Sequence, residues 1–111
     1  MKKTLNITRA LADENRLRAL MMLRNGEMCV CRIIEMLGLA PSTVSKHMSI
    51  LKQADLVETR RAGKWTYYRL PGEEASPEIS AIIGWVNHCL SDDALISEDK
   101  KKLTGARSCQ S

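Results

Sequence analysis

Apolar residues recur at helical spacing along most of the chain, and this pattern predicts helices over residues 3–12, 14–24, 27–37, 41–53 and 77–90. Asp13 is placed to cap the second of them. The third has apolar side chains at i, i+3, i+4 and i+7, which are Val30, Ile33, Ile34 and Leu37. Gly38 ends the third helix and Pro41 opens the fourth. Two helices joined by so short a turn are typical of a helix-turn-helix.

The expected helix over residues 41–53 has two chemically opposed faces. Val44, Met48 and Leu51 form an apolar stripe, while the opposite face has short polar side chains, one central cation and no carboxylate. Short donors let a backbone come close and suit phosphates and base edges. A Ser-rich surface helix explains this helix alone equally well, but the neighbouring segments favour DNA. The candidate DNA-binding residues in it are Ser42, Thr43, Ser45, Lys46, Ser49 and Gln53.

Strong strand formers predict a β-hairpin after this helix, with strands at residues 56–61 and 65–70 and a turn at residues 62–64. Three cations, Arg60, Arg61 and Lys64, gather at its tip. A two-stranded hairpin is only marginally stable alone, so it should pack on the helices. The alternative is a solvated hairpin with ordinary edge charges. The order of elements favours a basic wing that contacts DNA.

The expected helix over residues 77–90 is unusually aliphatic for so short a chain. It begins with Ser76 and Pro77, as a capped helix does. Such a stripe suggests self-association as a symmetric dimer. Residues 97–111 are polar and read as a flexible tail, which leaves residues 1–96 as one DNA-binding and dimerisation domain. The stripe consists of Ile79, Ile82, Ile83, Val86 and Leu90.

Composition and charge strengthen the DNA-binding interpretation. The chain has 111 residues and a net charge of +4. Residues 41–69 hold six cations and two anions, whereas the other eleven cations and eleven anions cancel. One localised basic patch is the electrostatic footprint of a nucleic-acid binder. With no membrane-spanning apolar run and no signal-peptide core, we expect a cytoplasmic protein with reduced cysteines and no membrane partner.

The segment Cys29-Val30-Cys31 is the main chemical feature of the chain. Buried cysteines often only pack, but two thiols at a helix start can bind soft ions. On a regular helix residues i and i+2 point about 200° apart, so joint ligation would distort the first turn. That distortion would pull on the helix supporting residues 41–53. Without a nucleophile–base set or a phosphate loop, the pair favours sensing, and we expect no enzymatic activity.

Residues 27–70, together with the preceding segment LADENRLRALMML, resemble the core of the ArsR/SmtB winged-helix repressors, specifically the arsenic-responsive ArsR branch. Cys29 and Cys31 match the metalloid pair of that branch, and Ser42, Ser45 and His47 match its recognition helix. The resemblance implies a mainly α fold with a small β-hairpin: a winged helix-turn-helix of about five helices and a two-stranded wing. It also implies a homodimer that represses its operon from double-stranded operator DNA until As(III) or Sb(III) binds, without an organic cofactor.

Two departures from the pattern of this branch matter. Ile34 stands where some members place a third ligand, and Arg32 replaces the common Asp. A third thiolate would have to come from Cys89, Cys109 or a small thiol such as glutathione. Two alternative functions stay open beside the metalloid sensor: a repressor that responds to thiol oxidation at Cys29 and Cys31, and a winged-helix DNA-binding protein that needs no ligand.

Overall fold

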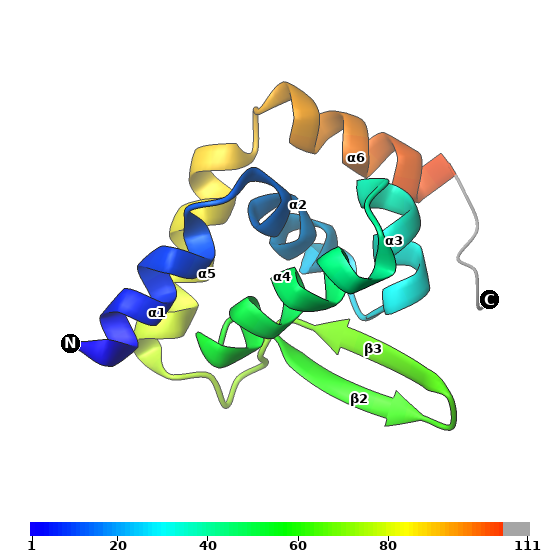
Figure 1. Ribbon diagram of the computed structural model, residues 1–111. Helices are drawn as coiled ribbons and strands as arrows, with labels where there is room; N and C mark the ends of the chain where they lie inside the picture. The colour runs from blue at the N-terminus through cyan, green and yellow to red at the C-terminus, as the bar shows by residue number, and fades with distance from the viewer. Residues whose placement is uncertain (106–111) are drawn as a thin grey trace.

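The computed structural model describes residues 1–105. Within them, no helix is long and apolar enough to cross a membrane. Residues 1–105 form six α-helices, one 3-10 helix (η1) and three strands. Their bounds are α1 Lys2–Leu11, α2 Glu14–Met22, η1 Leu23–Asn25, β1 Met28–Cys29, α3 Val30–Leu37, α4 Pro41–Gln53, β2 Glu58–Ala62, β3 Trp65–Arg69, α5 Pro77–Leu90 and α6 Ala94–Gly105. Figure 1 shows how the six helices and the hairpin strands β2 and β3 are arranged.

Helices α2, α3 and α4 surround the hydrophobic core, and the predicted apolar stripes point into it. The side chains of Leu20, Ile33, Val44, Met48 and Leu51 are completely buried. Asp13 caps α2 as expected, because its carboxylate accepts hydrogen bonds from two backbone N–H groups of the first turn, at 2.8 and 3.1 Å. Local sequence patterns therefore predicted the orientation of these helices correctly.

The turn between α3 and α4 confirms the predicted helix-turn-helix. Gly38 takes a left-handed conformation with φ of 66°, and its N–H donates to the Ile34 carbonyl at 2.9 Å. This conformation costs glycine little because it has no Cβ. Pro41 then fits the first turn of α4, where no intrahelical N–H bond is needed.

The sheet has three strands in the order β1-β3-β2, not the two that the sequence predicted. Met28 pairs with Tyr68, and Cys29 pairs with Tyr67, both antiparallel. The third helix accordingly begins at Val30 rather than at residue 27. Pairing of residues 28 and 29 with a strand about forty positions away leaves no local periodic signal, because strand pairs form between distant segments.

Much of the predicted apolar stripe of α5 packs against the core of its own chain. Ile79 and Val86 are each only 2% exposed, and Ile83 packs against the same core. The exposed apolar surface of α5 is centred instead on Trp85, whose exposure is 62%. The residues predicted for self-association are therefore not the apolar residues of α5 that remain most exposed. The aliphatic content of a helix does not indicate whether its own chain or a partner covers it.

Helix α6 lies where the sequence predicted a flexible tail from residue 97. Its residues Ile96 and Asp99 are 4% and 3% exposed. The Asp99 carboxylate accepts two hydrogen bonds from the Arg18 guanidinium of α2, both at 3.0 Å, which raises the pKa of Arg18. This contact joins residues 81 positions apart, so the polar composition of the segment could not indicate it. Residues 106–111, including Cys109, lie outside the described residues.

Candidate DNA interface and cysteine site

The polar face of α4 is exposed along its whole length. Burial of Val44, Met48 and Leu51 turns the opposite side of the helix to solvent. Donors of this size leave room for the helix backbone to approach a groove. Their arrangement on one surface is as predicted, while their contact with DNA stays a prediction. The exposed residues of this face are Ser42, Thr43, Ser45, Lys46, Ser49 and Gln53.

An arginine in α2 connects α4 to the rest of the domain, and the sequence did not reveal this. Arg16 Nη1 lies 3.0 Å from Nδ1 of His47 on α4. The same guanidinium donates to the carbonyls of Ala10 and Arg9 at the end of α1, at 3.0 and 2.9 Å. His47, which the sequence showed only as part of the family pattern of the recognition helix, thus helps to hold α4 against α1 and α2.

The hairpin β2–β3 extends beside α4 as an arm with cations near its tip (Figure 1). Gly63 makes the turn with φ of 63°, a left-handed conformation. Arg61 and Lys64 are exposed there, and the Lys64 ammonium lies 5.6 Å from the centre of the Trp65 ring. Both cations are exposed on the hairpin beside α4, and their contact with DNA stays a prediction.

Arg60, the third predicted cation of the hairpin, is exposed but lies in two contacts within the chain. Its guanidinium donates to both carboxylate oxygens of Glu27, at 2.6 and 3.0 Å. It also lies over the Tyr67 ring, 4.5 Å from the centroid. The hydrogen bonds lower the pKa of Glu27 and raise that of Arg60, so both stay charged at neutral pH. The partners are 33 positions apart in the chain, which explains why the sequence did not predict this pair.

Cys29 and Cys31 share one turn of the chain, but not the geometry that we expected. Cys29 is 2% exposed, ends β1 and caps α3 in an extended conformation. Its Sγ accepts the N–H of Cys31 at 3.3 Å. Because only Cys31 lies inside the helix, the two residues do not stand on opposed shoulders of a regular first turn. Ligation by both therefore need not unwind α3; it would act on the junction of β1 and α3 instead.

The cysteines also differ in chemical state. Cys29 and Cys89 are free, whereas Cys31 is disulfide-bonded. The prediction of thiols is therefore confirmed for the first two and is wrong for Cys31. It depended on an assumed reducing compartment, and the fold does not determine the compartment. A metalloid can reach both sulfurs of the pair only in the reduced protein.

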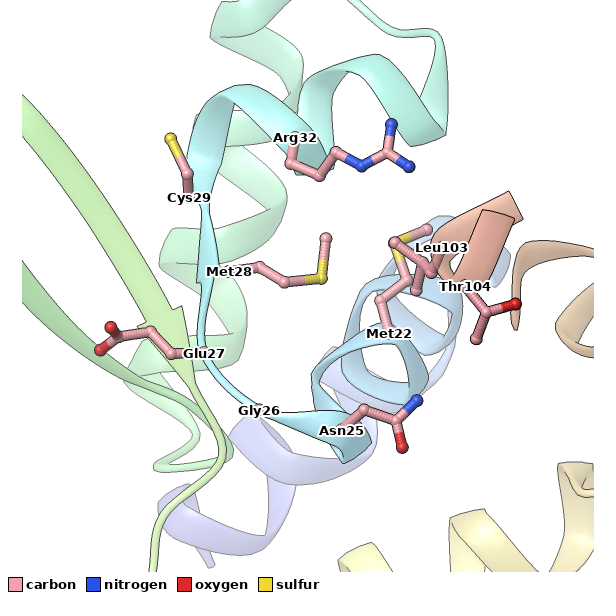
Figure 2. Close-up of a pocket in the computed structure, with 9 residues that line it drawn as sticks. All are labelled: Met22, Asn25, Gly26, Glu27, Met28, Cys29, Arg32, Leu103 and Thr104. Atoms are coloured by element: carbon pink, nitrogen blue, oxygen red, sulfur yellow. The ribbon is translucent and has the colours of Figure 1, made fainter. Parts of the chain in front are cut away.

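A cavity of about 240 Å³ opens between the β1–α3 junction and the end of α6. Met22, Met28 and Leu103 line its apolar part (Figure 2). Arg32 lies above it; its guanidinium pairs with Glu35 and donates to the Lys102 carbonyl. Figure 2 shows Met28 on the cavity side of β1, with the side chains of Glu27 and Cys29 on the other side. The strand β1, which ends at Cys29, thus faces the hydrophobic cavity on one side and the hairpin on the other.

No third metal ligand joins the cysteine pair among residues 1–105, where no three His, Cys, Asp or Glu side chains form a metal-binding group. Cys89 lies on α5 in a groove with Leu11 and Leu17. Of the third ligands considered, Cys89 of the same chain is therefore not brought to the pair. Cys109 lies outside the described residues.

The fold and these exposed surfaces define a winged helix-turn-helix: α3 and α4 form the helix pair, and β2–β3 forms the wing. Comparison with known proteins gives the family. Residues 13–59 match the model described as "Bacterial regulatory protein, arsR family", and relatives over most of the chain agree with it. The chain belongs to this family of transcriptional regulators, and the prediction that it is not an enzyme is confirmed.

Three proteins illustrate the relationship. An uncharacterized HTH-type transcriptional regulator of Methanocaldococcus jannaschii is 37% identical over 73% of this chain and 92% of its own. The arsenic resistance transcriptional regulator ArsR1 of Pseudomonas putida is 34% identical over 80% of this chain and 73% of its own. A homodimeric winged helix-turn-helix domain from Mycobacterium bovis, described as a possible ArsR-family regulator, superposes with a TM-score of 0.68 and 30% identity, over 84% of this chain and 82% of that one.

Proposed function

We propose that this protein is a cytoplasmic repressor that binds operator DNA as a homodimer and is released when As(III) or Sb(III) binds the reduced Cys29 and Cys31. The observation that carries this proposal is the position of the pair at the junction of β1 and α3. One side of the junction is hydrogen-bonded to the wing strand β3, and the other leads into the helix before α4. Thiolates prefer soft ions. The Pseudomonas putida relative, named an arsenic resistance regulator, supports the choice of inducer.

The exposed face of α4 would enter the major groove, with Ser45 and Lys46 near base edges. Arg61 and Lys64 of the wing would contact the DNA backbone or the minor groove alongside. Arg60 belongs to the same basic surface, although Glu27 holds its guanidinium in the free protein. Clustered cations of this kind give sequence-independent affinity, while the short polar groups of α4 supply readout.

Replacing Lys64 by alanine should weaken operator binding on every sequence and reduce the slope of log K against log salt by about one unit, because one phosphate contact is lost. The measurement is a salt titration of an operator fragment and of an unrelated fragment. Lys100→Ala is the matched control, since Lys100 is exposed on α6, across the molecule from α4 and the wing (Figure 1). A slope for Lys64→Ala equal to that of the parent would remove Lys64 from the contacts with DNA.

Helices α1 and α5 would form the dimer interface. They lie side by side (Figure 1). An apolar groove lined by Ile7, Leu11, Ile82 and Trp85 runs between them. Trp85 of this groove and Leu5 of α1 are large apolar side chains that remain 62% and 57% exposed. Exposed apolar surface of this kind commonly marks an interaction site. The homodimeric Mycobacterium bovis neighbour supports a second copy of the chain as the partner.

A titration of the reduced protein–operator complex tests the inducer. Arsenite should weaken operator binding by roughly 5- to 150-fold, the range of ordinary allosteric coupling. The complex is followed by fluorescence anisotropy with excess small thiol, and thiolate–metalloid absorbance reports ligation in parallel. Release by oxidant alone would instead indicate a thiol-redox repressor. A complex that responds to neither would indicate a winged-helix protein whose DNA binding needs no ligand.

A further inference from the structure

The ion pair between Glu27 and Arg60 connects the segment that carries Cys29 to the outer strand of the wing. We propose that Glu27 is a positioning residue that, through Arg60, transmits movement at Cys29 to the DNA-binding wing. The coupling role rests on the proposed function, because it describes how ligation of that site reaches DNA. The ion pair acts as a clamp on the segment of residues 27–29, and this clamp can be tested without any ligand.

The register of the sheet places the participants in one row. Cys29 in β1 is opposite Tyr67 in β3, and Tyr67 is opposite Arg60 in β2. Side chains of directly opposed residues share one face of a sheet. Glu27 precedes Cys29 by two residues, and Figure 2 shows both side chains on the same side of the strand. Arg60 therefore reaches across Tyr67, on which it stacks, to the carboxylate of Glu27.

The Glu27–Arg60 ion pair connects the β1 segment to β2, which backbone hydrogen bonds between strands do not do. The strand β1 has two residues and pairs with β3, whereas β2 is on the far side of β3. So short an edge strand can separate easily. The two hydrogen bonds from Arg60 tie the start of this segment directly to β2. A displacement of Cys29 is then felt by both wing strands, and the wing moves as a unit with the cysteine segment.

An ordinary surface ion pair would stabilise the protein little and would have no such role. The bidentate geometry and the aromatic stacking distinguish this pair from the second ion pair of the wing. There Arg69 donates to Glu58 at 3.1 Å, and both partners belong to the hairpin itself. That pair cannot connect the hairpin to the cysteine segment. Glu58→Gln is therefore the matched control for Glu27→Gln.

Two measurements on the full chain test the proposal. Without ligand, backbone hydrogen–deuterium exchange of residues 27–29 should accelerate in Glu27→Gln and remain at the parent rate in Glu58→Gln. With arsenite and excess thiol, both variants should ligate the metalloid as the parent does, judged by absorbance. The weakening of operator binding by arsenite should fall in Glu27→Gln to roughly one fifth of the parent's factor or less, and should be unchanged in Glu58→Gln.

Unchanged exchange in Glu27→Gln would overturn the clamp, and release as complete as in the parent would overturn its coupling role. Both results differ from a failure of the proposed inducer. The parent protein itself would then neither ligate arsenite nor leave DNA. In that case the exchange comparison still decides whether Glu27 fixes the segment.

Discussion

A Cys29→Ser variant is expected to bind its operator as the parent does and to remain bound when arsenite is added. Cys29 caps α3 by accepting the Cys31 N–H, and serine is a preferred residue at that position. The change should therefore preserve the fold and the DNA-binding surface while removing one soft ligand. We expect Cys31→Ser to behave in the same way. Operator binding with and without arsenite, on the reduced proteins, measures the loss as disappearance of the roughly 5- to 150-fold response.

Cys89→Ser is the control for this experiment. Cys89 is a free, exposed thiol on α5, on a different element from the β1–α3 junction. Its replacement should leave the arsenite response unchanged, which separates the effect of a particular site from that of total thiol content. If Cys29→Ser leaves the operator at the same arsenite concentration as the parent, the metalloid binds elsewhere, and the β1–α3 junction is not the sensor.

Replacing Trp85 by glutamate should separate the dimer and weaken operator binding together. Large aromatic side chains at the centre of interfaces commonly contribute about 2 kcal/mol or more, so we expect the dimer dissociation constant to rise roughly thirtyfold or more. Operator affinity should fall with it, because two recognition helices must bind half-sites one helical turn apart. Sedimentation velocity and anisotropy on the same samples measure the two effects.

The fold of the monomer should survive this change, since Trp85 is mostly exposed and outside the buried core. Ser80→Glu is the control: Ser80 is also exposed on α5, but about 140° around the helix from Trp85. Ser80→Glu should leave both the dimer dissociation constant and the operator affinity as in the parent. If Trp85→Glu remains a dimer at micromolar concentration, the groove between α1 and α5 is not the interface.

The apolar stripe of α5 shows how far a local pattern can be interpreted. Its spacing correctly predicted a helix, and Ser76 caps it through the Ile79 N–H at 3.3 Å. Its assignment to self-association was wrong in part, because Ile79 and Val86 are buried within the same chain. An apolar stripe indicates that one face of a helix is covered. Only the packing shows whether the same chain or a second copy covers it.

The sequence by itself determined the helix-turn-helix and the polar face of α4. Burial at Val44, Met48 and Leu51 follows from a spacing that any helix must satisfy, and Gly38 and Pro41 set the turn through their own backbone preferences. It also placed the positive charge correctly in the segment of α4 and the wing, because net charge along a chain does not depend on folding.

Tertiary structure alone decided the surroundings of Cys29. Its place in a strand, the pairing with β3 and the link from Glu27 to Arg60 join segments more than thirty residues apart. The same is true of α6, which Asp99 and Arg18 hold across 81 residues. Local periodicity records only which neighbours share a face. Strand pairing and ion pairs depend instead on which distant segments meet once the core has formed, and that meeting gives the cysteine segment its connection to the wing.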